Sequence, residues 1–345
     1  MKRLFGLISI LLFVASFVFA ETSVLIDFND LIDDGGGQNS ATELDFSSEA
    51  PANMPAEERA ELKTSLFIGN WRVSYNTSAR NILRERLTRI TPVTSNELGK
   101  TVMGIRLVFP EWNNNANARV LPPFSIPVNA PGDGGAPGAP SKFDNKGIIK
   151  NVGSLKSISM NMRGLDFPHT VTLIIEDPKG QVREIPMGRL DFQGWKTLTW
   201  TNPNYIYDVR NLSLVKMPLY PFTVPILRLI GFKFYRDANS VGGDFITYIS
   251  DVTVTYDKAI DDTVPVDIDD EAVWGILTAR EQTRFRLEMQ RFGERQLLEV
   301  TKKKLQDQST PNTYPADGQI QNPSRTNIGE ARGGEATGGA TAPAQ

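Results

Sequence analysis

Alternating apolar and polar residues predict a series of short β-strands along the middle of the chain. The clearest are Ser154–Met162 and Phe245–Tyr256, in which apolar side chains recur at about every second position. Turn-forming residues such as Asp177–Gly180 (DPKG) separate neighbouring runs, as in a sheet built from hairpins. The same pattern predicts further strands at Ser23–Phe28, Ser65–Tyr75, Thr101–Phe109, Thr170–Glu176, Gln181–Pro186, Trp195–Trp200 and Ile226–Phe234. This succession favours a mainly β fold, a β-sandwich of jelly-roll type, over any βαβ arrangement.

The hydrophobic period changes near the C-terminus, where the pattern predicts an amphipathic helix over residues 272–306. Its large apolar residues fall at spacings of 3, 8, 4 and 3, which places them along one helical face. Two interpretations stay open: the helix packs on its own sandwich, or it docks on another subunit, since large aromatic anchors are typical of interfaces. The interface candidates are Trp274, Leu277, Phe285, Met289 and Phe292.

Composition organises the rest of the chain around one β domain, expected at residues 21–260. A stretch at 129–140 reads NAPGDGGAPGAP, which is too rich in glycine and proline for a regular element and predicts a long surface loop. An acidic linker, 261–271, leads to the helix. Residues 307–345 contain hardly any large apolar side chain, so we expect a disordered tail there.

Residues 1–20 have the pattern of a secretory signal peptide. A cationic start, Met1–Arg3, precedes an apolar run from Leu4 to Phe19. The run is shorter than a typical membrane-spanning helix, and polar Glu21 follows almost at once. We therefore expect cleavage between Ala20 and Glu21, which leaves a mature chain with no membrane span.

Composition also excludes several kinds of chemistry. The chain of 345 residues has no cysteine and one histidine, His169. It can therefore form no disulfide, thiolate nucleophile, cysteine-ligated metal or multi-histidine metal site. His169 stands at a strand entrance with no marked nucleophile, so a hydrogen-bonded structural imidazole is the expected role. The formal net charge of -3 argues against nucleic acid binding through a basic surface, and no catalytic residue is predicted.

Carboxylates near the first and last strands are the remaining candidates for a metal site. Asp27, Asp30 and Asp251 could offer oxygen ligands to a calcium ion if these strands are neighbours. Aspartate is also a common turn former. We therefore expect solvated turn carboxylates at these positions, with no bound metal and no cofactor.

Tryptophans suggest an alternative function. An exposed set that includes Trp71 and Trp112 could form a platform for sugar rings, as in an exported carbohydrate-binding jelly-roll module. Trp195 and Trp200 lie in an otherwise apolar strand pattern, for which core packing is the stronger expectation.

Two long stretches, Gly147–Trp195 and Phe232–Asp257, closely resemble the spirochaete flagellar filament outer-layer protein family, FlaA. The resemblance extends to the start LIDFND, Leu25–Asp30, and to NWRVSYNTSAR, Asn70–Arg80. It covers most of the chain between the expected signal peptide and the acidic linker. These are sequence patterns of a whole family and mark no catalytic motif.

The resemblance implies a structural subunit of the sheath around a periplasmic flagellar filament. Such a subunit coats a flagellin core and contributes to filament stiffness, shape and motility. Implied partners are flagellin subunits, other copies of the chain and, as a further candidate, other sheath proteins. The resemblance implies neither catalysis nor nucleic acid binding, and its physical requirement is a rigid body with complementary patches repeated along a filament.

Overall fold

The computed structural model describes most of the chain between residue 20 and residue 309. The contacts divide the chain into two units, Met1–Leu298 and Glu299–Gln345. None of the helices in the described ranges combines the length and the apolar character that crossing a membrane requires. The described residues are 20–32, 42–60, 62–111, 115–128, 142–214, 225–259 and 276–309.

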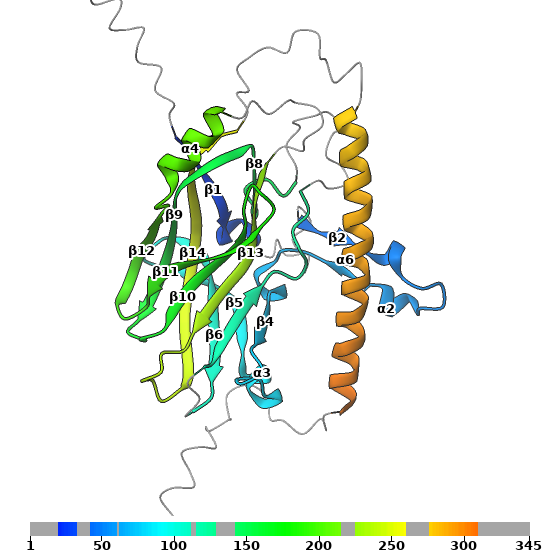
Figure 1. The fold of residues 1–345 in the computed structure, drawn as a ribbon. Coiled ribbons are helices and arrows are strands. Elements are labelled where there is room, and N and C mark those ends of the chain that lie inside the picture. Colours follow the sequence, from blue (N-terminus) through cyan, green and yellow to red (C-terminus); the bar gives the residue numbers. More distant parts are fainter. Residues whose placement is uncertain are drawn as a thin grey trace, which may run out of the picture. The chain divides into compact units, whose positions relative to one another are not determined.

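Two antiparallel sheets form the body of the first unit (Figure 1). The first sheet has the order β12-β9-β14-β6-β5, and β1 also pairs with β14. Its strands are β1 (Glu21–Asp27), β5 (Arg89–Ser95), β6 (Lys100–Phe109), β9 (Val152–Leu165), β12 (Gln193–Thr201) and β14 (Gly243–Lys258).

The second sheet has the order β11-β10-β13-β7-β4, with β8 also paired to β13. Its strands are β4 (Arg72–Tyr75), β7 (Asn117–Leu121), β8 (Ile148–Lys150), β10 (Thr170–Glu176), β11 (Val182–Arg189) and β13 (Ile226–Tyr235). A separate two-stranded ladder joins β2 (Leu44–Asp45) to β3 (Lys63–Thr64).

The strand pairs are nested in the manner of a jelly roll. The innermost pair, β10 with β11, is a hairpin in the second sheet, and the next, β9 with β12, lies in the first sheet. The pair β7 with β13 returns to the second sheet, and β6 with β14 completes the first. This alternation between two sheets confirms the predicted β-sandwich of jelly-roll type.

Helices are few and mostly short. The 3-10 turns are η1 (Phe28–Leu31), η3 (Ser47–Glu49) and η4 (Ile68–Asn70). The α-helices are α2 (Ala56–Ala60), α3 (Ile82–Leu87), α4 (Tyr205–Leu214) and α6 (Ile276–Ser309). At 34 residues, α6 confirms the predicted C-terminal helix, although it continues to Ser309 and so includes the first residues of the predicted tail.

The core is filled by alternate residues of both sheets. On β9, Ile158, Met160 and Met162 are fully buried, while the residues between them are only half-buried. On β13, Phe232 and Phe234 are fully buried. Burying a side chain of this size contributes roughly 1.5–3 kcal/mol, so the apolar alternation that predicts the strands also supplies their stabilisation.

The structure departs from the predicted elements in three places. The strand expected over 65–75 is wrong in its first half, because Ile68–Asn70 forms the turn η4 and only β4 is extended. The sequence gave no signal for β5, which contains Pro92, or for β7, which reads NARVL. Pairing with β6 and β13 holds these weakly patterned segments extended. The predicted loop at 129–140, the linker at 261–271 and residues 310–345 of the tail lie outside the described residues.

Candidate functional site

Helix α6 carries the interface residues that the sequence predicts. Phe285 and Met289 are half-buried, and Phe292 is only 4% exposed. Leu277 lies in the first turn of the helix, where only its backbone is described, and Trp274 lies outside the described residues. The predicted apolar stripe therefore becomes more deeply covered towards its C-terminal end.

A close approach at Gly293 shows what covers that end. A Cβ atom at this position would lie 2.5 Å from Cγ of Glu49, which is too close for real atoms. Helix α6 and the segment that follows η3 can therefore meet here only because residue 293 has no side chain. Phe292 belongs to this packing within the chain, so it is less accessible to a partner than Phe285 or Met289.

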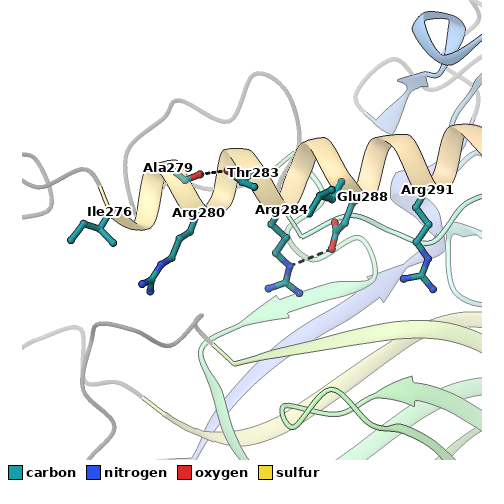
Figure 2. A pocket seen from close by; sticks show the side chains of 8 residues that line it. Ile276, Ala279, Arg280, Thr283, Arg284, Glu288 and Arg291 are labelled. Carbon is teal, nitrogen blue, oxygen red and sulfur yellow. Dashed lines mark hydrogen bonds and ion pairs between the residues drawn. The ribbon is translucent and has the colours of Figure 1, made fainter.

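Another face of α6 lines an open groove with a volume of about 720 Å³ (Figure 2). Leu287, which lies along this groove, is 61% exposed. Arg284 contacts Glu288 one turn later, with 3.3 Å between Nε and Oε1. The described lining residues recur at the helical spacing and are Ile276, Ala279, Arg280, Thr283, Arg284, Leu287, Glu288 and Arg291.

This groove combines exposed aliphatic side chains with guanidinium groups. Arg280 and Arg291 are exposed, whereas Arg284 is partly held by its ion pair to Glu288. Such a surface can accept an apolar side chain flanked by carboxylates, because arginine binds carboxylates in a bidentate manner. Sequence reasoning missed this face because its apolar residues stand singly among charged ones, without the aromatic residues that drew attention to the other side.

The structure brings Asp27 and Asp251 together, but around a lysine. Lys100 Nζ lies 3.1 Å from Asp27 Oδ2 and 3.0 Å from Asp251 Oδ2. The two aspartates are directly opposite each other on β1 and β14, and Asp30 is exposed on η1. The described residues contain no group of three or more His, Asp or Glu side chains placed to hold a metal ion.

Lys100 provides the positive charge that these carboxylates require. Burial lowers the pKa of Lys100, but hydrogen bonds to Asp251 and Asp27 outweigh that effect and raise its pKa above 10.5. Asp27 Oδ1 also accepts a hydrogen bond from the backbone N–H of Asn29 at 3.0 Å. The cluster therefore connects β1, β6 and β14 and serves as a structural ion pair.

Replacing Lys100 with methionine should lower the free energy of unfolding by about 1–3 kcal/mol, because two facing carboxylates lose their common donor. The matched control is Lys63→Met, whose partner Asp45 is 3.2 Å away in a pair about half exposed (46% and 42%). That change should cost less than about 1 kcal/mol. Urea denaturation measures both, and a calcium-dependent rise in the wild-type melting temperature would instead show that the aspartates hold a metal.

His169 is a core residue. Its imidazole is 2% exposed, and its Nδ1 accepts a hydrogen bond from the backbone N–H of Asp237 at 3.2 Å. The ring lies 4.8 Å from the ring of Phe245 and 5.2 Å from that of Phe109. Burial lowers the pKa of His169 from 6.5 to about 4, against the nearby charge of Asp237. The expected structural, hydrogen-bonded role is confirmed.

The tryptophans do not form one exposed platform. Trp71 is 4% exposed, donates its indole N–H to the Leu66 carbonyl at 3.1 Å and packs edge-on against Phe28. Trp195 and Trp200 are half-buried at separate positions on β12, and Trp112 lies outside the described residues. Trp71 is therefore a core residue that cannot stack on a sugar.

Comparison with solved structures finds carbohydrate-binding modules with low overall similarity. One is the module TmCBM61 in complex with β-1,4-galactotriose, at 12% identity and a TM-score of 0.28, covering 55% of this chain and 90% of that one. Another is CBM27-1 of Caldicellulosiruptor saccharolyticus in complex with mannohexaose, at 11% identity and a TM-score of 0.29, covering 56% of this chain and 92% of that one.

Sequence comparison finds much closer relatives. A flagellar filament outer layer protein of Spirochaeta aurantia is 41% identical over 88% of this chain and 93% of its own length. Its counterpart in Treponema pallidum is 38% identical over 86% of this chain and 92% of its own length. The profile of the family described as flagellar filament outer layer protein Flaa matches residues 36–264, which span nearly all of the jelly roll. The chain therefore belongs to the FlaA family of flagellar filament outer layer proteins.

Proposed function

We propose that this protein is a non-enzymatic structural subunit of the outer layer of a flagellar filament in the periplasm. The observation that carries the proposal is the family match over residues 36–264, together with relatives of that name that align over more than nine tenths of their length. The subunit coats a core of flagellin subunits and contacts further copies of itself. Many weak contacts of this kind, repeated along a filament, sum to a stable layer and stiffen it.

The start of the first strand supports export with cleavage between Ala20 and Glu21. Strand β1 begins at Glu21, and this residue pairs with Tyr256 on β14. Its carboxylate also lies 3.1 Å from Nζ of Lys258. Cleavage at the proposed bond removes the apolar leader and leaves the whole of β1 in the mature chain, so processing and folding are compatible.

Helix α6 supports a role in docking onto the filament core. Phe285 and Met289 remain partly accessible on one face, and Leu287 is exposed beside Arg280 and Arg291 on another. Exposed leucines next to arginines are unusual unless a partner covers them. We place the flagellin contact on this helix, with Trp274 and Leu277 at its N-terminal end.

Deleting the gene should leave filaments that are thinner in electron micrographs and cells with altered motility, because the core loses its coat. The intact protein should co-sediment with isolated filaments. Recovery of the protein only in the soluble periplasmic fraction, with a normal filament diameter in its absence, would contradict the proposal.

Complementing the deletion with variants tests the docking surface in the same experiment. Leu287→Asp should reduce the amount of protein on filaments without changing the melting temperature of the purified protein, since Leu287 is 61% exposed. Val182→Asp is the matched control, because Val182 is 64% exposed but lies on β11. Equal filament binding by both variants would remove α6 from the interface.

A further inference from the structure

The two sheets end in four strands, and three of them carry features that block pairing with another chain. Strand β5 contains Pro92, which lacks a backbone N–H. Strand β11 contains Pro186 and pairs with β10 through a register shift. Strand β4 is only four residues long. Natural proteins commonly protect exposed edges with prolines, bulges and short strands.

Strand β12 lacks all three kinds of protection. It has nine residues without proline, and it pairs with β9 in unbroken register from Gln193 to Thr201. Among the residues that the structure describes, β9 is its only ladder partner. Its far edge therefore presents a row of backbone N–H and C=O groups that a further strand can pair with.

The outward face beside this edge is flat and uncharged. Thr197, Thr199 and Thr201 are exposed on it, and they lie opposite Asn161, Ser159 and Ser157 of β9. Ser159 and Thr199 share a hydrogen bond between their hydroxyl groups at 3.0 Å. The one charged residue of β12, Lys196, belongs to the alternate set of positions. Nothing on this face repels an identical face.

We propose that β12 pairs in antiparallel fashion with β12 of a second copy, about a twofold axis at Leu198. This register places Thr197 of each copy opposite Thr199 of the other. It also places Lys196 opposite Trp200, so the two lysines avoid each other and each ammonium group lies next to an indole ring. The result is an isologous contact in which one continuous sheet spans two subunits.

This pairing deepens the proposed function, on which it rests for its place in the filament layer. It identifies one contact through which copies of the subunit recognise each other. A contact made by backbone groups and threonine hydroxyls leaves helix α6 free for the filament core, so lateral pairing and docking use separate surfaces.

Unique cysteines test the register, because the chain has no cysteine of its own. We expect the purified full-length protein to form dimers whose amount rises with concentration. A mixture of Thr197→Cys and Thr199→Cys proteins should form a disulfide between unlike chains more readily than either variant alone, since residues directly opposite each other lie closest. A purified protein that stays monomeric, or like-chain disulfides that form as readily, would overturn the proposal.

Added charge tests the contact independently of cysteine chemistry. The double variant Thr197→Lys with Thr199→Lys should weaken dimerisation by about tenfold or more, because lysines then face lysines across the twofold axis. Its melting temperature should not change, since both positions are exposed. Thr22→Lys is the matched control, because Thr22 is exposed on β1 of the same sheet. A double variant that dimerises like the control would overturn the proposal.

Sedimentation with isolated filaments separates this inference from the proposed function. A protein that dimerises through β12 but does not bind filaments contradicts the filament role and leaves the pairing in place. A protein that binds filaments but shows neither dimers nor the 197–199 disulfide contradicts the pairing and leaves the filament role in place.

Discussion

Replacing Arg228 with methionine should lower the free energy of unfolding by about 3–5 kcal/mol, because it leaves the Glu176 carboxylate covered and unpaired. The two residues stand directly opposite each other on β13 and β10, and their side chains are only 12% and 16% exposed. Arg228 Nε donates to Glu176 Oε2 at 2.7 Å, and Nη1 donates to the Ile126 carbonyl at 3.3 Å. Urea denaturation followed by circular dichroism measures the loss.

The double variant Arg228→Met with Glu176→Met separates the two contributions. Most of the stability should return, because a covered ion pair is often no more stable than apolar side chains of similar size. The exposed pair Arg106–Asp244 provides the control, since its side chains are 42% and 47% exposed and Arg106→Met should cost less than about 1 kcal/mol. A similar loss for Arg228→Met and Arg106→Met would show that burial does not decide the effect.

Acidification should destabilise the protein by about 3 kcal/mol between pH 6.5 and pH 4 through His169 alone. Burial lowers the pKa of His169 to about 4, whereas the unfolded chain takes up the proton near pH 6.5. Between these values the unfolded state binds more protons than the folded state, so stability falls as the pH falls. Above pH 6.5 both states are neutral at this residue, and its contribution is fully present.

A variant that cannot titrate isolates this effect. His169→Asn keeps an acceptor for the Asp237 N–H but has no ionisable group. It should be less stable at neutral pH, because it loses ring contacts with Phe109 and Phe245, and its stability should fall less steeply with acid. The chain has one histidine, so a single imidazole resonance reports the pKa by NMR. A midpoint near 6.5 in the folded protein would contradict the prediction.

Much of the fold could be predicted from the sequence because the central strands carry their own pattern. Strands β9 and β14 are buried on one face, and their alternation shows it directly. Strand β7, NARVL, is too short to establish a period, and Pro92 interrupts β5. These two strands depend on neighbours distant in sequence, which a local pattern does not reveal.

The candidate sites could be predicted less well, because their chemistry depends on partners far along the chain. Asp27 and Asp251 attract attention as acids at strand ends, yet Lys100 determines their role from 73 and 151 positions away. Trp71 suggests a platform until Phe28 and the Leu66 carbonyl place it in the core. The helical period of α6 predicts an apolar stripe, but it does not indicate that Gly293 must approach Glu49.

The long final strand β14 determines when the protein can finish folding. Its residues 243–258 form ladders with three strands, β1, β6 and β9, that are all synthesised much earlier. Until the ribosome has passed residue 258, β6 and β9 lack the neighbour that lies between them in the finished sheet. Ladders that wait for a distant segment form slowly. A chain with this topology stays slack enough to be threaded through a translocation pore and becomes rigid only once its last strand has crossed.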